Sequence, residues 1–357
     1  MPADAASGPG AASVRLLDLI NVTDKPADGS PPHARRATSV PLDFETNHAP
    51  YYRFFLAPDP RPHGFIHPDT VAKLPWPAAF IVDHAARSVT VSPPPEGTSL
   101  SDHANAALQE AVDAAVAAPA DFPTLNGLHS EYFVVPGARA FVQVERFAAP
   151  LFGIASRGAH LTCYVRDHDD GDAATTDGER LRIWVARRSL RLFTYPGMLD
   201  STVAGGVKAD DSPRDCIEAE AGEEASLPSE LVTLSSPSSA AGSASPLRSV
   251  GTVTLANRNA RTGLFHSEVL YVYDMEMPPG VAPRPNPDDD EVEEFLLMGC
   301  AEVRERMARG EFKPNVCAVM IDFLVRHGEV TAENEPDYAE ICSRLHRRLP
   351  VPTVSDL

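Results

Sequence analysis

Hydrophobic and polar residues alternate in short runs along much of the chain, a period of two that is typical of strands with one buried face. Two such runs, residues 131–135 and 140–144, flank the turn Pro136-Gly137 and are expected to pair. The pattern predicts strands over residues 51–56, 78–82, 88–91, 131–135, 140–144, 160–165, 181–185, 252–255 and 267–275.

A helical period replaces this alternation at a few places. In residues 102–118 the apolar side chains of Ala107, Leu108, Val112 and Val116 recur at helical spacing. Further helices are predicted over residues 14–22, 300–309 and 315–327. The elements up to residue 125 form a small α+β unit, and 357 residues suit two domains. We therefore expect an N-terminal α+β domain at 1–125 and a second domain at 126–357.

Three segments interrupt these elements. Residues 1–13 and 24–38 are rich in Ala, Gly, Pro, Ser and Asp and are predicted to form a loose lead-in. Residues 235–249 have low complexity and are predicted to be a flexible loop. The acidic segment 166–172 lies between two predicted strands and is expected to form a turn.

Charge and cysteine usage limit the function classes. The chain has 31 basic and 50 acidic side chains, a formal net charge of −19, which disfavours nucleic acid and anionic membranes as partners. Five scattered cysteines, with no C-x-x-C pair, argue for a reducing compartment. The N-terminal residues have neither a signal-peptide core nor an anchor, so we expect a cytoplasmic protein.

Residues 202–228 are the most informative stretch for chemistry. Gly205 and Gly206 lack a Cβ and allow the backbone to approach a ligand closely. The sequence Ser212-Pro213-Arg214-Asp215 predicts a helix start with an N-cap serine, a proline in the first turn and a capping aspartate. The helix then carries Glu220, Glu223 and Glu224, which are spaced three and four residues apart and share a face.

Like charges on one helix face are destabilising by about 0.2–0.5 kcal/mol per pair. A solvated acidic face is the simplest interpretation of such a cluster. The preceding glycines and the capped helix start favour the alternative that the carboxylates bind Mg²⁺ or Mn²⁺, which prefer oxygen ligands. A bound cation would also allow an acidic protein to hold an anionic phosphate.

This stretch resembles the Nudix box, G-x5-E-x7-R-E-U-x-E-E-x-G-U, in which U is aliphatic. The match is anchored by Gly205, Glu220, Glu223, Glu224 and Leu227. Further segments resemble the Nudix branch that is fused to thiamine pyrophosphokinase in fungi and stands alone in yeasts and plants. They are residues 184–189, 194–200, 291–295, 310–315, 322–327 and 333–338.

Three positions depart from the box. Asp211 replaces its first glutamate, Ala219 replaces the arginine that pairs with that glutamate, and Ser226 replaces a glycine. The resemblance implies that the arginine and the glutamate brace the loop against the helix. Ala219 cannot form such a pair, so Ala219→Arg is expected to stabilise the loop if Asp211 lies opposite.

The resemblance implies a Nudix α/β/α sandwich and a Mg²⁺- or Mn²⁺-dependent pyrophosphohydrolase. By family position, Glu223, Glu224 and the carbonyl of Ala204 bind the metal, and Glu220 faces the metal and orients or deprotonates water. Glutamates outside the box often contribute, and Glu291 is the preferred candidate, followed by Glu294. The implied catalytic set is Glu220, Glu224 and Glu291, with Gly205 and Gly206 in the substrate loop.

The expected partner is a small-molecule diphosphate, and a homodimer is left open. The branch suggests that oxothiamine or oxythiamine diphosphate is cleaved to the monophosphate in a housecleaning role. Two alternatives stay open: a degenerate Nudix-like module that binds without turnover, and a hydrolase acting on ADP-ribose or nucleotide sugars. Tyr195, Tyr271 and Phe265 are candidates to stack on a heterocycle, although aromatic residues in strands are more often part of a core.

Overall fold

The computed structural model describes residues 14–20, 48–125, 127, 131–166, 181–233, 247–259 and 262–355. The loose lead-in at 1–13 and 24–38 lies outside these residues, as do 167–172 of the acidic segment and 235–246 of the low-complexity segment. The prediction of a flexible loop is wrong for its last residues, 247–249, because a strand begins at Leu247.

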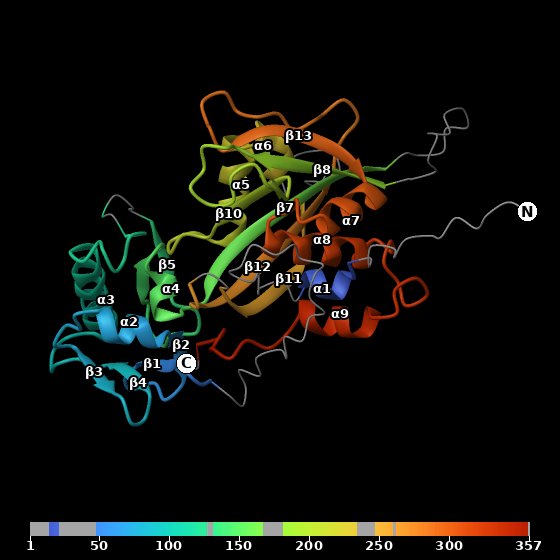
Figure 1. The fold of residues 1–357 in the computed structure, drawn as a ribbon. Coiled ribbons are helices and arrows are strands. Elements are labelled where there is room, and N and C mark those ends of the chain that lie inside the picture. Colours follow the sequence, from blue (N-terminus) through green and yellow to red (C-terminus); the bar gives the residue numbers. More distant parts are fainter. Residues whose placement is uncertain are drawn as a thin grey trace, which may run out of the picture.

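The first unit is built on a four-stranded sheet with the order β2-β1-β4-β3. The apolar side of the predicted helix, now α3, packs in one core with this sheet and buries Ala107, Leu108 and Val112. Figure 1 shows this unit in blue and green, apart from the larger sheet. Its elements are β1 (Tyr52–Leu56), β2 (Pro62–Ile66), α2 (Pro68–Lys73), β3 (Phe80–Asp83), β4 (Ser88–Val91) and α3 (Leu100–Val116).

A short hairpin and a helical turn follow: β5 (Tyr132–Val134), β6 (Gln143–Glu145) and α4 (Ala149–Phe152). The predicted pairing around Pro136-Gly137 is confirmed, because β5 and β6 are antiparallel. The hairpin and α4 share the hydrophobic core of the first unit, which continues as far as Ile154. The predicted boundary at residue 125 stays a prediction, although packing in the first unit runs beyond it.

The second unit is a seven-stranded sheet with the path β11-β12-β7-β8-β13, to which β10 adds beside β7 and β9 beside β8. Strand β7 lies between β12, to which it is parallel, and β8, to which it is antiparallel. The strands are β7 (Ser156–Arg166), β8 (Leu181–Arg188), β9 (Leu199–Asp200), β10 (Val203–Gly206), β11 (Leu247–Arg258), β12 (Phe265–Glu276) and β13 (Val292–Gly299).

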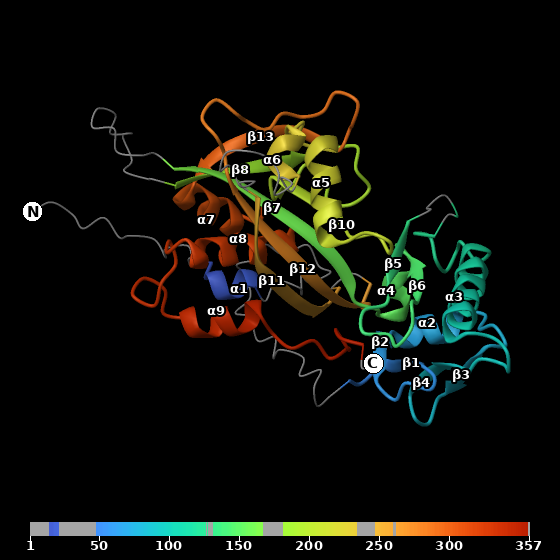
Figure 2. The same cartoon turned by 180° about the vertical axis from the view of Figure 1, so that it is seen from behind.

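Helices cover both faces of this sheet, as Figures 1 and 2 show from opposite sides. Because alternate side chains of a strand point to opposite faces, β12 sends Leu270 and Val272 into one core and Tyr273 and Met275 into the other. The first core holds α1 (Leu16–Ile20), α7 (Cys300–Ala308), α8 (Pro314–Arg326) and α9 (Tyr338–Leu345); the second holds α5 (Pro213–Glu223) and α6 (Ser229–Val232). The predicted α/β/α sandwich is confirmed.

A smaller apolar cluster joins the two units. Tyr51 and Phe65 of the first unit pack there with Phe265 and Val269 of β12. The Tyr51 hydroxyl also donates a hydrogen bond to the carbonyl of Gly263, at 2.6 Å. The first unit is therefore attached to the end of the large sheet at which β7 begins and β10 ends.

Candidate active site

Helix α5 places the predicted carboxylates, and its start is set by local sequence. The Ser212 hydroxyl accepts a hydrogen bond from the Asp215 N–H at 3.2 Å, and the Asp215 carboxylate accepts one from the Ser212 N–H at 3.0 Å. The predicted capping pair is therefore present, and Pro213 begins the helix. Cys216, Ile217 and Ala221 bury the opposing helix face against the sheet.

The strand before the helix meets two of the three glutamates. An ideal Cβ on Gly205 would lie 2.3 Å from Oε1 of Glu220, so only glycine leaves room for that side chain. The N–H of Ala204 donates a hydrogen bond to Oε2 of Glu224 at 3.1 Å. What approaches Gly205 in this structure is thus a carboxylate of the same site.

The three carboxylates differ in burial, a difference that their spacing alone did not reveal. Glu224 is only 6% exposed, Glu220 is partly buried, and Glu223 is exposed. Glu224 and Glu220 contact β10, whereas the side chain of Glu223 is exposed to solvent. The structure therefore provides two inward carboxylates and one at the edge.

Burial and mutual repulsion make the inward pair unusual. Burial raises the pKa of Glu220 to about 7, and the charges of Glu291 and Glu223 add to the increase. Burial also raises the pKa of Glu224 well above its usual value, with a further contribution from Glu220. Burial and the neighbouring carboxylates both disfavour the ionised form of these two side chains. A nearby cation would favour the ionised form.

Of the two glutamates proposed from outside the box, Glu291 is the one near the pair. Its charge contributes to the raised pKa of both Glu220 and Glu224. Glu294 instead bonds to the guanidinium of Arg187 at 2.6 Å and is half exposed. The catalytic role of Glu291 stays a prediction.

The residues fit a cation that is only partly coordinated by protein. Within the described ranges, no group of three or more His, Cys, Asp or Glu side chains is arranged as a metal site. Mg²⁺, however, usually takes one or two carboxylates and fills its shell with water and substrate phosphate. The inward carboxylates with raised pKa values suit that kind of binding.

The departures from the box have visible structural counterparts. Ala219 is exposed, and the pKa of Lys208 in this loop is raised mainly by its bond to Glu131, with Asp211 the smallest contributor. Ser226 has φ +49°, a left-handed conformation that favours glycine. The glycine conformation is therefore kept although the residue has changed. Cys216 is buried, and burial raises the pKa of its thiol to about 12, which supports a packing role.

Sequence reasoning missed three charged residues near the carboxylates, of which Lys208 lies within the box and the other two outside it. Glu131, Arg146 and Lys208 come from the start of β5, the end of β6 and the loop after β10, and they are joined by ion pairs. Nothing in the spacing of Glu131 and Arg146 links them to the box, because the link is made by the contact between the two units.

The candidate stacking residues are not equivalent. Phe265 is fully buried and belongs to the cluster between the units, so it is unavailable to a ligand. Tyr271 is partly buried and packs against two cores. Tyr195 is 42% exposed and is the most accessible of the three.

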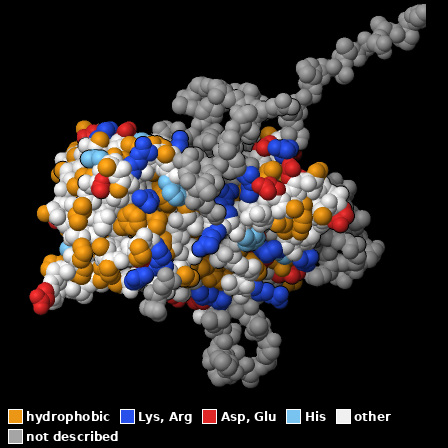
Figure 3. Space-filling view, turned by 90° about the horizontal axis from the view of Figure 1, so that it is seen from below, with side chains coloured by type: hydrophobic (Ala, Val, Ile, Leu, Met, Phe, Trp, Pro, Cys, Tyr) orange, Lys and Arg blue, Asp and Glu red, His pale blue; other side chains and the backbone are white. Residues whose placement is uncertain are grey.

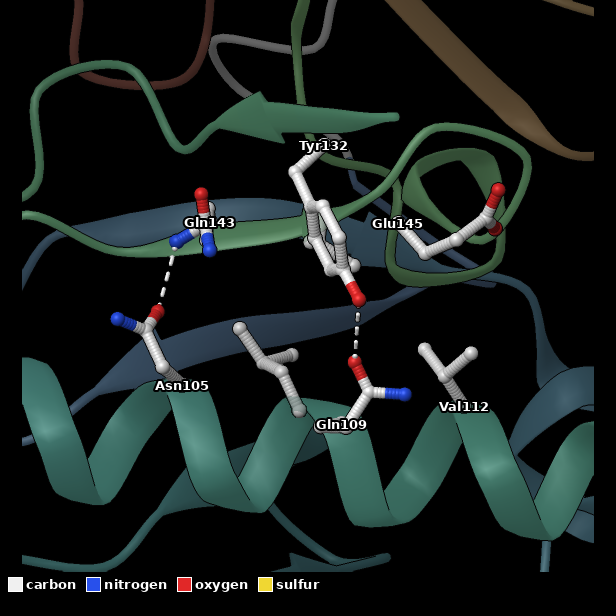
Figure 4. Close-up of a pocket in the computed structure, with 8 residues that line it drawn as sticks. Asn105, Gln109, Val112, Tyr132, Gln143 and Glu145 are labelled. Carbon is white, nitrogen blue, oxygen red and sulfur yellow. Dashed lines mark hydrogen bonds between the residues drawn. The ribbon is translucent and has the colours of Figure 1, made fainter. Parts of the chain in front are cut away.

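A separate cavity of about 210 Å³ lies between α3 and the β5–β6 hairpin (Figure 4). Two pairs of residues that line it are hydrogen-bonded: the Tyr132 hydroxyl donates to Gln109 at 3.1 Å, and the Gln143 N–H donates to Asn105 at 2.8 Å. None of the site carboxylates lines this cavity. It is therefore not the place where the box acts.

Comparisons with known proteins agree with the geometry. Residues 172–316 match the NUDIX domain. An uncharacterised protein of Saccharomyces cerevisiae is 37% identical over 227 residues, covering 64% of this chain and 63% of the relative. Nudix hydrolase 20, chloroplastic, of Arabidopsis thaliana is 33% identical over 228 residues, covering 63% of this chain and 54% of the relative.

The solved structure of DR0079 from Deinococcus radiodurans covers 61% of this chain and 100% of its own, with 19% identity and a TM-score of 0.34. This similarity is too low to indicate a function for the chain. The matched region spans 54–63% of the length of the two curated relatives, so the activity of the whole protein is a proposal.

Proposed function

We propose that this chain, which carries a NUDIX domain over residues 172–316, hydrolyses a diphosphate linkage in a small molecule with a divalent cation. The observation that carries the proposal is the pair of inward carboxylates, Glu220 and Glu224, held against Gly205 and Ala204 and raised in pKa. A solvated acidic helix face would leave both groups exposed and near their usual pKa.

Each residue has a distinct part in this proposal. Glu224, Glu223 and the carbonyl of Ala204 would hold Mg²⁺ or Mn²⁺, and the Ala204 N–H fixes one oxygen of Glu224. When bound, the ion neutralises charge and polarises the phosphoryl oxygens. Glu220 faces the same space and would orient water or accept a proton from it; its pKa of about 7 is that of the metal-free protein, and a bound cation would lower that pKa. Glu291 completes the carboxylate cluster.

For the substrate we propose thiamine diphosphate analogues, oxothiamine or oxythiamine diphosphate, cleaved to the monophosphate. The support is the resemblance to the thiamine-linked Nudix branch over residues 184–189, 194–200 and 291–295. Tyr195 adds an exposed ring at the surface of the second unit. A compartment and a homodimer stay predictions. None of the described helices is long and apolar enough to cross a membrane.

The test is a substrate panel with Mg²⁺ omitted and restored. The panel contains oxythiamine and oxothiamine diphosphates, thiamine diphosphate, ADP-ribose and a nucleotide sugar. We expect metal-dependent release of phosphate from the thiamine analogues, lost in Glu223→Gln and Glu224→Gln. Glu294→Gln is the control, because Glu294 is bound to Arg187 away from the pair.

The outcomes separate the alternatives. Preference for ADP-ribose over every thiamine analogue would reject the substrate but keep the enzyme. Binding of the compounds without release under Mg²⁺ and Mn²⁺ would reject the enzyme and favour the binding module.

A further inference from the structure

We propose that Arg146, which the first unit contributes, and Lys208 bind the phosphate groups of the substrate, so that the first unit completes the site. This inference rests on the proposed function. Two features point to it: the position of these cations beside the paired glutamates, and a ligand that would need positive charge in a chain of net charge −19.

The first unit reaches the box through its hairpin. The N–H of Ala209, in the loop between β10 and α5, donates a hydrogen bond to the Tyr132 carbonyl of β5 at 2.8 Å. Figure 2 shows β10 and this loop running toward β5. Phe133 packs so closely that a Cβ on Gly206 would lie 2.9 Å from its ring. The hairpin and the glycine loop are therefore in direct contact.

Arg146 lies at this contact. A Cβ on Gly206 would be 3.7 Å from the guanidinium carbon of Arg146, one residue from the point at which Gly205 meets Glu220. The guanidinium lies over the ring of Phe133, with its carbon 5.7 Å from the ring centre, and bonds to Glu131 at 2.6 Å. The guanidinium is thus held between aromatic rings and a carboxylate, close to Gly206.

Lys208 lies on the same side of the site. Its ammonium is 3.3 Å from the carboxylate of Glu131, to which Arg146 also bonds at 2.6 Å. The two cations therefore lie together beside the loop that follows Gly206.

The two cations keep capacity for a ligand. The side chain of Arg146 is 43% exposed and that of Lys208 is 52% exposed, and they share the single carboxylate of Glu131. A guanidinium has five N–H donors and matches a phosphate in a planar, two-point manner, and an ammonium adds a point charge. A diphosphate that enters beside the carboxylates would meet these donors.

The experiment measures binding without turnover, in the full chain. Methylenediphosphonate, a diphosphate that cannot be hydrolysed at its bridge, is titrated by calorimetry with Mg²⁺ present. We expect Arg146→Ala to raise its Kd by about tenfold or more, since a hydrogen bond to a charged group contributes on that scale. Lys208→Ala should raise it less, and Arg146→Lys should lie between Arg146→Ala and the unmodified protein.

Arg166→Ala is a matched control. Arg166 is also 43% exposed, also lies over an aromatic ring, that of Tyr164, and also pairs with a glutamate, but at the far end of β7. Its removal should leave the Kd within twofold, whereas an equal loss in both arginine variants would overturn the proposal as a general charge effect. Thermal unfolding of each variant shows that it is folded.

Glu131→Gln separates ligand binding from bracing. If the cations bind phosphate, releasing them from Glu131 leaves the Kd of the diphosphonate unchanged or lower. If Arg146 only braces the loop through Glu131, Glu131→Gln and Arg146→Ala weaken binding equally, which would overturn the proposal. An unmodified protein that does not bind the diphosphonate would overturn it as well.

Hydrolysis is measured in parallel so that the two proposals fail separately. A protein that cleaves a panel substrate while Arg146→Ala binds the diphosphonate normally refutes this inference alone. A protein that cleaves nothing, yet loses diphosphonate binding in Arg146→Ala, refutes the enzyme and keeps the phosphate site. With an active enzyme, KM should rise more than kcat falls in Arg146→Ala.

Discussion

Two buried carboxylates on the second unit differ in their environment. Asp274 of β12 and Glu224, the residue that follows α5, are 5% and 6% exposed. Asp274 bonds to His327, at 2.9 Å, and to both terminal nitrogens of Arg326. Burial would raise the pKa of Asp274, but the bonds from His327 and Arg326 outweigh it and lower that pKa. Glu224 accepts a backbone hydrogen bond and has other carboxylates near it, and its pKa is raised.

The contrast separates structural charge from charge kept for a ligand. A buried carboxylate that is matched by protein cations stabilises the fold in its ionised form, whereas an unmatched one costs free energy until a cation arrives. Arg326, the cationic partner of Asp274, ends α8, which packs on the opposite face of the sheet from α5, and His327 follows it in the chain. One face of the sheet thus carries a carboxylate paired with a protein cation, Asp274 with Arg326. The other face carries Glu224, which accepts its bond from a backbone N–H and lies near other carboxylates.

The largest effect is expected when the ion pair between Asp274 and Arg326 is broken. Asp274→Asn leaves the partly buried guanidinium of Arg326 without one of its carboxylates, and we expect the free energy of unfolding to fall by about 3 kcal/mol. Chemical denaturation at pH 7 measures it. Activity per folded molecule should be kept, and a variant as stable as the unmodified protein would contradict the role assigned to the pair.

The loss of stability in Asp274→Asn should depend on pH in a definite direction. Because folding lowers the pKa of Asp274, its stabilising contribution is complete above the unfolded pKa and is lost as the pH falls through the folded pKa. The difference in stability between Asp274→Asn and the unmodified protein should therefore be largest near neutral pH and shrink below about pH 4. A difference that stays constant from pH 7 to pH 3 would show that ionisation of Asp274 contributes nothing.

Replacing Glu224 should lower activity strongly and leave stability unchanged or higher, the reverse of the effects expected for Asp274. Glu224→Gln is expected to reduce kcat by at least about a hundredfold, the scale of loss when a group that positions a metal is removed. The free energy of unfolding of the metal-free protein should stay equal or rise, because the amide is cheaper to bury than a repelled carboxylate. Steady-state kinetics and metal-free denaturation measure the two quantities. A large loss of stability would make Glu224 a structural residue like Asp274.

A smaller effect concerns the room that the glycine leaves beside the pair. Gly205→Ala would place a methyl group 2.3 Å from Oε1 of Glu220, so we expect activity to fall by roughly tenfold as Glu220 is displaced. Gly222 in α5 has no atom within 4 Å of its ideal Cβ, so Gly222→Ala is the matched control. It should keep activity and raise stability by about 0.5–1 kcal/mol. Equal activity in both variants would contradict the close contact.

The smallest effect lies at the end of the same helix. Ser226 has φ +49°, and the left-handed conformation costs a residue with a Cβ about 1 kcal/mol or more. Ser226→Gly should therefore raise the free energy of unfolding by about 1 kcal/mol without changing kcat. An unchanged melting temperature would mean that the strain is relieved elsewhere.

The sequence predicted elements whose cause is local. The capping residues of α5, the helical period of α3 and the alternating pattern of β12 each act within a few residues, and the structure confirms them. The strand β2 was missed because Pro62 and Gly64 interrupt its pattern. Its residues are stabilised by pairing with β1 rather than by their own propensity.

The site was predictable only in part for the same reason. The spacing of Glu220 and Glu224 on one helix gave the carboxylates, but burial, which divides Glu223 from the other two, depends on the contact with β10. Arg146 could not be found from spacing, because it reaches the box only through the hairpin that joins the units. Charge distribution was likewise hidden: on the face seen in Figure 3, basic and hydrophobic side chains outnumber acidic ones among the coloured atoms, despite the net charge of −19.

The position of β7 has a practical consequence for anyone who wishes to express part of this chain. Strand β7 ends at Arg166, before residue 172, where the family match begins, and it pairs with β8, β10 and β12. A fragment cut at the family match would lack the strand that joins the two halves of its sheet. A fragment cut at residue 156 would keep that strand but lose Arg146. Truncation designs therefore need to keep the first unit and also α1 (Leu16–Ile20), which packs in the core of the large sheet.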